Sequence, residues 1–150
     1  MNSITNYKII SKLYEASNAG VKIEMIVRGV CCLIPGVKDM SENIKVISVV
    51  DKYLEHPRIY IFENAGKPKI YISSADWMTR NFENRIEVTC PIYDTNLQNQ
   101  ILDTFDISWS DNVKSRFINE LKGKNKRKKN IINTRSQFET YRYFKNLLPK

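Results

Sequence analysis

The segment "VKIEMIVR" (residues 21–28) decides the fold class. Apolar side chains at the odd positions 21 to 27 alternate with mostly polar ones, which predicts a half-buried β-strand with Arg28 at its carboxyl end. The preceding "SITNYKIISKLYEASNAG" (residues 3–20) spaces its apolar residues as an amphipathic helix does, and Ser3 or Thr5 could cap its start. A helix followed directly by a strand indicates an α/β fold.

Further strands are predicted on both sides of a loop and a hairpin. The loop is "GVCCLIPGVKDMSEN" (residues 29–43), too rich in Gly and Pro for regular structure, and the hairpin turns through "ENAGKP" (residues 63–68). The predicted strands are "IKVISVV" (44–50), "RIYIF" (58–62), "KIYIS" (69–73) and "RIEVTCPI" (85–92). Helical spacing returns over 95–104 and 136–148, the latter with an apolar stripe (Phe138, Tyr141, Phe144, Leu148) that we expect to pack. We therefore expect one domain over residues 1–150, with a central mixed sheet of about five or more strands flanked by helices.

The net charge of +8 has a local origin. The run "KGKNKRKK" (residues 122–129) holds six Lys and Arg and no acid, and without it 18 Lys and Arg face 16 Asp and Glu. We expect residues 122–130 to form a basic loop before the terminal helix. Such a loop could contact a polyanion, but a nucleic-acid partner is not expected for the whole domain.

Cysteine usage and hydropathy point to a soluble, cytoplasmic protein. No apolar run approaches the ~18 residues that a membrane span requires, and the amino terminus lacks the layout of a secretory signal. The three cysteines form no C-x-x-C and the chain has one histidine, so no metal site is expected, and the thiols are predicted to be buried and reduced.

The only histidine, His56, lies in "YLEHPRIYIFEN" (residues 53–64). A residue before proline favours extended geometry, so His56 and Arg58 should share one face at a strand start, about 7 Å apart at their backbones. An imidazole beside a guanidinium suits a phosphate group. From this stretch alone, a structural histidine is the favoured alternative, with Arg58 and Glu63 in surface ion pairs. The spacing H-x-R-x4-E, followed by "SSAD" (residues 73–76), loosely resembles the H-x-K-x4-D pattern of the phospholipase D superfamily.

Longer blocks carry a more specific resemblance. "AGVKIEMIVRGVCCLIPG", "SENIKVISVVDKYLEHPRIYIFENAG", "IYISSADWMTRNFENRIEV" and "SDNVKSRF" resemble, in order and spacing, the carboxyl-terminal end of bacterial polyphosphate kinases. The resemblance implies the second of two phospholipase D-like catalytic domains, with the active site between them. It also implies reversible transfer of the terminal phosphate of ATP to polyphosphate through a phosphohistidine, with Mg²⁺. The implied partners are ATP, ADP, polyphosphate and the preceding catalytic domain, in a homo-oligomer. Peripheral association of the full-length enzyme with the membrane is an alternative location.

The resemblance assigns roles to two residues. Arg28 in "IVRG" and His56 in "LEH" fall on nucleotide-phosphate contacts of the family, and His56 is expected to assist the transfer as well. The family's phosphorylated histidine and most Mg²⁺ ligands are expected on a preceding domain outside this chain, so the chain alone should be inactive. Arg58, Ser73, Ser74 and Arg80 are second-tier candidates. Two other readings are a phospholipase D-type phosphodiesterase that pairs two His56 motifs in a dimer, and a non-enzymatic polyanion-binding domain that uses the basic run.

Overall fold

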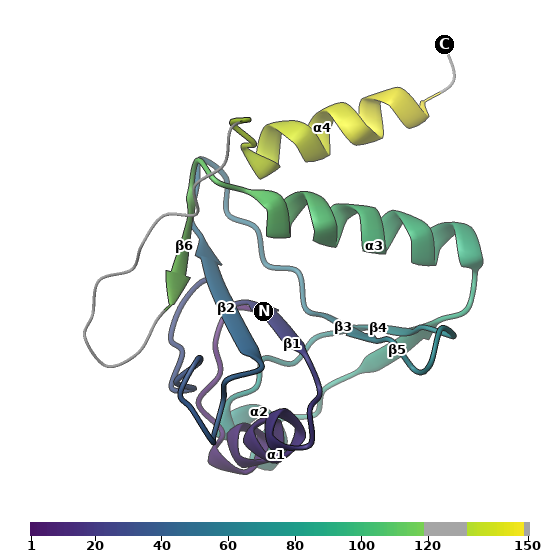
Figure 1. The fold of residues 1–150 in the computed structure, drawn as a ribbon. Helices are drawn as coiled ribbons and strands as arrows, with labels where there is room; N and C mark the ends of the chain where they lie inside the picture. Colours follow the sequence, from purple (N-terminus) through teal and green to yellow (C-terminus); the bar gives the residue numbers. More distant parts are fainter. Residues whose placement is uncertain (119–131, 149–150) are drawn as a thin grey trace.

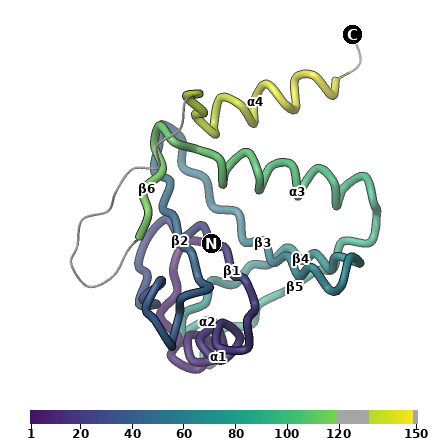
Figure 2. Tube along the Cα trace, in the orientation of Figure 1, coloured from purple at the N-terminus to yellow at the C-terminus, as the bar shows by residue number. Residues whose placement is uncertain are grey.

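The chain folds into two small sheets with helices at opposite ends of the molecule (Figures 1 and 2). The computed structural model describes residues 1–118 and 132–148. Within these ranges the elements are α1 (Tyr7–Asn18), β1 (Ile23–Ile26), β2 (Ile44–Val49), β3 (Ile59–Phe62), β4 (Lys69–Ser73), α2 (Thr79–Glu83), β5 (Thr89–Ile92), α3 (Thr95–Ser110), β6 (Ser115–Ile118) and α4 (Ser136–Leu147). The predicted basic loop at residues 122–130 lies outside the described residues.

Helix α1 confirms the amphipathic pattern but starts later than expected. Its cap is Asn6, whose side chain accepts a hydrogen bond from the Ile9 amide over 3.1 Å, rather than Ser3 or Thr5. Ser3 is buried, and its backbone carbonyl accepts a hydrogen bond from Trp77. The amino-terminal segment therefore joins the core before the helix begins.

The first sheet has the order β1-β2-β6, with β1 parallel and β6 antiparallel to β2. The predicted alternation in residues 21–28 is confirmed in part: Met25 and Val27 are buried while Glu24 is exposed, but Val21, expected on the buried face, is 50% exposed. Met25 and Val27 pack with Val46 of β2 in the main hydrophobic cluster. The other buried members of that cluster are Ile4, Ile10, Leu33 and Ile44.

The second sheet is antiparallel, with the order β3-β4-β5. The expectation of one central sheet of about five strands is therefore wrong, because the six strands of the described residues divide into two sheets of three. The physical reason is that β2 is paired on its two sides by β1 and β6, whereas β3 pairs with β4 through the hairpin at residues 63–68 and so belongs to the second sheet. The sequence pattern did not predict strand β6.

Strand β5 is shorter than the alternation in residues 85–92 predicts. It covers Thr89–Ile92. Ile86 is fully exposed and Val88 is 61% exposed, so this apolar face is not buried against the described part of the chain. Alternation alone cannot show whether a partner layer exists.

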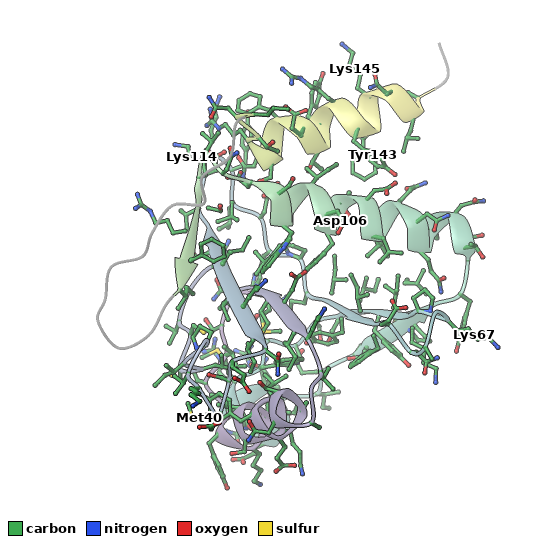
Figure 3. The ribbon with its side chains drawn as sticks, in the orientation of Figure 1. Met40, Lys67, Asp106, Lys114, Tyr143 and Lys145 are labelled. Atoms are coloured by element: carbon green, nitrogen blue, oxygen red, sulfur yellow. The ribbon has the colours of Figure 1, made fainter. Side chains whose placement is uncertain are left out.

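Helices α3 and α4 form a layer above the second sheet (Figure 1). Helix α3 extends six residues beyond the expected end at Thr104. Tyr143, on the side of α4 toward α3 in Figure 3, donates a hydrogen bond to Asp103 over 2.8 Å. The expected packing stripe of α4 is largely exposed, from 41% at Phe138 to 68% at Leu148.

The segment between β2 and β3 is fastened to the start of α4. Asp51 accepts hydrogen bonds of 2.8 and 2.7 Å from Arg135. The main-chain amide of Tyr53 donates to the Gln137 side chain, and the main-chain carbonyl of Tyr53 accepts a hydrogen bond from it. This segment leads into His56. Its anchoring therefore helps to fix where the histidine enters the second sheet.

Two other expectations have mixed outcomes. The three thiols are free, as predicted, but Cys32 and Cys90 are exposed and Cys31 is half-buried, so their predicted burial is wrong. In residues 1–118 and 132–148, we find no helix with both the length and the apolar character of a membrane span.

Candidate functional site

Strand β1 ends at Ile26, earlier than predicted, so Arg28 lies two residues beyond its carboxyl end. Its guanidinium donates from Nε and Nη2 to the side-chain oxygen of Asn2, over 3.0 and 2.6 Å. Nη1 donates to the main-chain carbonyl of Glu55 over 2.8 Å. Glu55 directly precedes His56 in the chain, so the first and second sheets bring the two predicted site residues to one place.

His56 and Arg58 share one carboxylate partner, Asp76. The Nε2 atom of His56 lies 3.3 Å from Oδ2 and 3.4 Å from Oδ1 of Asp76. Arg58 approaches the same carboxylate, with Nη2 3.4 Å from Oδ2 and Nε 3.4 Å from Oδ1. The predicted common face of His56 and Arg58 is confirmed. For Arg58, the alternative of a surface ion pair is replaced by this half-buried ion pair.

Asp76 is 4% exposed and accepts hydrogen bonds from the amino-terminal segment as well. The Asn2 amide donates to Oδ1 over 2.8 Å and the Ser3 amide over 3.4 Å. Burial raises the pKa of Asp76, but the hydrogen bond from the Asn2 amide and the ion pair with Arg58 outweigh it, so the net pKa is lowered. Asp76 is therefore an ionised acceptor near neutral pH.

Asn2 connects the two halves of the site. Its side-chain oxygen holds Arg28, and its main-chain amide binds Asp76, which in turn contacts His56. The strand-like segment around it is fixed on both sides, because Ile4 bridges to Cys31 and to Trp77 and is fully buried.

The second-tier candidates do not all join this cluster. Arg58 does, but Ser73 bonds to Thr89 Oγ1 over 2.8 Å. Ser74 donates a short hydrogen bond to the Glu87 carboxylate. Arg80 lies exposed in the short helix α2. Ser73 and Ser74 thus fasten β4 to the segment before β5.

Glu63 lies at the far end of β3 from His56. Its Oε1 accepts a hydrogen bond from the Gly66 amide over 3.1 Å and so closes the predicted hairpin turn. The H-x-R-x4-E spacing therefore does not reproduce a catalytic pairing of His56 with Glu63.

The carboxylates around the site do not fit a metal ion. Both oxygens of Asp76 already contact donors, and Glu87 accepts hydrogen bonds from Ser74 and from Asn81, the latter over 2.6 Å. Over the described ranges, 1–118 and 132–148, no group of three or more His, Cys, Asp or Glu side chains could hold a metal.

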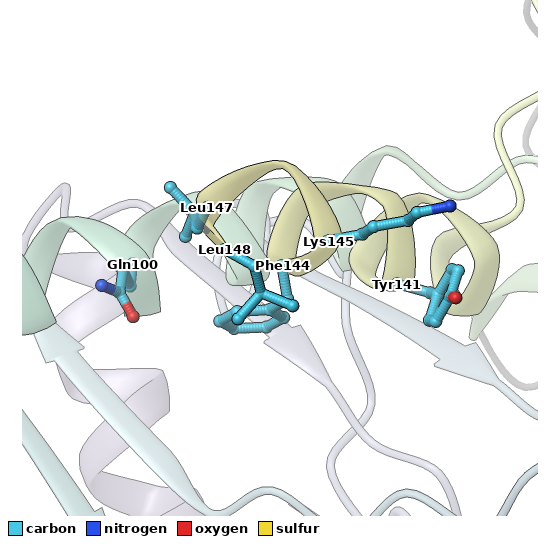
Figure 4. A pocket seen from close by; sticks show the side chains of 6 residues that line it. All are labelled: Gln100, Tyr141, Phe144, Lys145, Leu147 and Leu148. Atoms are coloured by element: carbon cyan, nitrogen blue, oxygen red, sulfur yellow. The ribbon is translucent and has the colours of Figure 1, made fainter. Parts of the chain in front are cut away.

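A separate pocket lies between α3 and α4 (Figure 4). Its lining is mainly apolar and includes Tyr141, Phe144 and Leu148 of the predicted stripe. It carries one cation, Lys145, and no acid, and it does not contribute to the Arg28–His56 cluster.

Comparison with known proteins gives the family. Residues 1–139 match the family model described as polyphosphate kinase C-terminal domain 2. The chain belongs to this family. It is 49% identical, over 98% of its length, to a polyphosphate kinase of Vibrio parahaemolyticus, and 47% identical over 98% to one of Escherichia coli. A solved structure of polyphosphate kinase from Porphyromonas gingivalis matches 98% of the chain at 46% identity, with a TM-score of 0.94.

The chain spans 21% of the Vibrio parahaemolyticus polyphosphate kinase, 22% of the Escherichia coli one and 23% of the Porphyromonas gingivalis chain. It therefore corresponds to about a fifth of these family members, at their carboxyl-terminal domain. The resemblance to polyphosphate kinases expected from the sequence blocks is confirmed.

Sequence reasoning missed two members of the cluster, Asn2 and Asp76. Asp76 lies in the quoted stretch "SSAD" and Asn2 near the amino terminus, but 74 positions separate them and neither follows a hydrophobic period. For Asp76, the one usable signal is an acid placed directly after a predicted β-strand, where site residues often lie.

Proposed function

We propose that this chain is a phospholipase D-like catalytic domain, residues 1–150, of a cytoplasmic polyphosphate kinase. The complete enzyme would reversibly transfer the terminal phosphate of ATP to polyphosphate through a phosphohistidine on another domain. This domain would contact the nucleotide and polyphosphate phosphates and pack against that preceding domain, in a homo-oligomer.

The hydrogen bond from Arg28 to the Glu55 carbonyl is the observation that carries the proposal. It holds a permanent cation at the residue directly before the single histidine, although Arg28 follows β1 of the first sheet and His56 precedes β3 of the second. In phosphoryl transfer, the protein mainly positions the reacting groups and stabilises negative charge. Arg28 would clamp phosphate oxygens, and His56 would donate a hydrogen bond or a proton to them.

Arg58 has a supporting role in this proposal. Its guanidinium is paired with Asp76, and its side chain is 23% exposed, less than that of His56 at 32%. Arg58 would balance the buried charge of Asp76. Mg²⁺ remains an expectation of the family resemblance, to be held by substrate phosphates and by residues outside this chain, because the carboxylates here are engaged.

Calorimetric titration with tripolyphosphate and with ADP at low ionic strength tests the proposal. The chain should bind both weakly, and Arg28→Ala or His56→Ala should weaken binding about tenfold or more, as expected for loss of a charge-assisted hydrogen bond. Arg142→Ala is a matched control, since this exposed arginine pairs with Glu139 on α4. Equal loss in all three variants, or unchanged affinity in the first two, would contradict the assignment.

The basic run needs a separate control. Deleting residues 122–129 removes six positive charges, so long-range attraction of any polyanion should fall. The proposal expects tripolyphosphate binding that still depends on Arg28 in the deletion variant. A deletion variant without any such binding would instead support a non-enzymatic polyanion-binding domain.

A further inference from the structure

We propose that Asn2 and Asp76 are positioning residues that set the guanidinium of Arg28 and the imidazole of His56 for one phosphate group. This inference rests on the proposed function of those two residues. Asn2 and Asp76 would act through hydrogen bonds and would not touch the phosphate themselves.

Asp76 fixes which nitrogen of His56 faces the phosphate. The carboxylate lies within 3.3 to 3.4 Å of Nε2 and accepts hydrogen bonds only, so it favours the tautomer with the proton on Nε2. Nδ1 is then the nitrogen turned away from Asp76. It donates to a phosphate oxygen only in the protonated imidazole, because in the neutral Nε2–H tautomer it carries a lone pair. Since Asp76 is buried and His56 is partly exposed, the solvent side of the ring is the side open to a ligand.

Asn2 fixes the orientation of the Arg28 guanidinium. Its Oδ1 accepts from Nε and Nη2, while its Nδ2 donates to Ser3 Oγ over 2.9 Å, which determines the direction of the amide. Of the five guanidinium N–H groups, three bind Asn2 and Glu55. Among the described residues this leaves one N–H on each of Nη1 and Nη2, a forked pair suited to two phosphate oxygens.

The Asn2–Arg28 contact and the Asp76–His56 contact are coupled because Asn2 takes part in both. Its side chain holds Arg28, and its main-chain amide donates the shortest hydrogen bond that Asp76 accepts, at 2.8 Å. A displacement of Asn2 would therefore move the Arg28 guanidinium and, at the same time, the Asp76 carboxylate that accepts from His56. A carboxylate with a purely structural role differs visibly: Asp111 is also fully buried, but it binds the main-chain amides of Val113, Lys114, Ser115 and Ser136.

The variant Asp76→Asn makes a specific prediction for the imidazole. The Asn2 and Ser3 amides both point at Oδ1, so the new side-chain oxygen should stay there and the new NH₂ group should replace Oδ2, nearest His56 Nε2. A donor at that place requires a lone pair on Nε2. The neutral imidazole should therefore switch its proton from Nε2 to Nδ1, which the ring ¹⁵N chemical shifts report directly at about pH 8.5, above the usual histidine pKa.

Variants of Asn2 test the contact between Asn2 and Arg28. Asn2→Ala removes the acceptor of two guanidinium donors, whereas Asn2→Asp keeps an oxygen there and should restore the contact. We expect roughly tenfold weaker tripolyphosphate binding for Asn2→Ala and near-normal binding for Asn2→Asp. The Arg28 Nε–H resonance should shift and exchange faster in Asn2→Ala without any ligand present.

Asp111→Asn is the matched control, because it alters an equally buried aspartate away from the cluster. It should lower stability but leave the His56 tautomer and the tripolyphosphate affinity of the folded protein unchanged. An unchanged tautomer in Asp76→Asn, together with an unchanged Arg28 Nε–H signal in Asn2→Ala, would overturn the inference.

The ligand-free signals keep this test apart from the proposed function. If wild-type protein fails to bind tripolyphosphate while both signals change as expected, the positioning contacts stand and the phosphate assignment falls. If wild type binds and Arg28→Ala does not, but the Asn2 and Asp76 variants bind like wild type, the positioning inference falls alone.

Discussion

Arg28 donates from Nη1 to the main-chain oxygen of Glu55 across 2.8 Å, and this bond joins the end of the first sheet to the entry of the second. The two residues lie 27 positions apart, on either side of a Gly- and Pro-rich loop and strand β2. Arg28 thereby binds the carbonyl of the residue before His56, while the imidazole itself contacts Asp76. The following predictions test this arrangement and its surroundings.

Arg28→Lys should not substitute for arginine. One ammonium group cannot hold Asn2 and Glu55 together and still offer a fork to phosphate. We expect about tenfold weaker tripolyphosphate binding with little change in the thermal unfolding midpoint. Calorimetry and circular dichroism measure the two quantities, and wild-type affinity in this variant would show that the fork is unnecessary.

Gly29→Ala should disturb the site through Asn2. A Cβ at Gly29 would lie 3.1 Å from the Asn2 carbonyl, 3.2 Å from Asn2 Nδ2 and 3.2 Å from Ser3 Oγ. These contacts are too close, so the amino-terminal segment must shift. Tripolyphosphate binding should weaken several-fold. Gly36→Ala, which strains the backbone at a φ of 77° but meets no atom within 4 Å, serves as a control for strain elsewhere in the same loop. Equal affinities in both variants would argue against a tight Asn2–Arg28 contact.

Local periodicity predicted individual elements well. The pattern in residues 21–28 gave both β1 and its buried side, and the hairpin at residues 63–68 was placed correctly between β3 and β4. These successes share one cause: each strand or turn is specified by neighbouring residues. The location of Arg28 beyond a strand end follows in the same way.

Strand pairing could not be predicted from the same signals. Strand β6 consists of four residues, too short to show alternation, yet it pairs with β2 and completes the first sheet. The Asn2–Asp76 hydrogen bond could not be predicted from local patterns either. It depends on how distant segments meet, and no local period encodes it.

Acid should weaken the fold through Asp111. Burial raises the pKa of Asp111, but hydrogen bonds from the Ser136, Lys114 and Ser115 amides outweigh it and leave the pKa lowered. A lowered folded-state pKa means that this stabilisation is complete above about pH 4, the unfolded value, and is lost as pH falls through the lower folded value. Stability should therefore decrease below pH 4.

Asp111→Asn isolates that contribution. At neutral pH we expect a loss of about 1–3 kcal/mol, because one main-chain donor is left facing an NH₂ group. The difference between variant and wild type should shrink toward low pH. Urea unfolding at several pH values measures it, and a difference independent of pH would contradict the ionised, hydrogen-bonded state of Asp111.

The hairpin turn offers a test of backbone strain. Ala65 and Gly66 have φ angles of 53° and 79°, in the left-handed region. Gly66→Ala should cost about 1 kcal/mol, although its Cβ would meet no atom within 4 Å, while Ala65→Gly should be neutral or slightly stabilising. Opposite signs in urea unfolding would support the turn, and equal destabilisation would contradict it.

Titration of the ¹⁵N-labelled chain with tripolyphosphate, following His56 ring nitrogens and the Arg28 Nε–H signal, tests the central claim most directly. The account predicts that both signals move together along one binding curve at low ionic strength, and that Arg142 on α4 does not follow them. Binding that leaves both signals in place, or no binding at all, would contradict the proposal that Arg28 and His56 form one phosphate site.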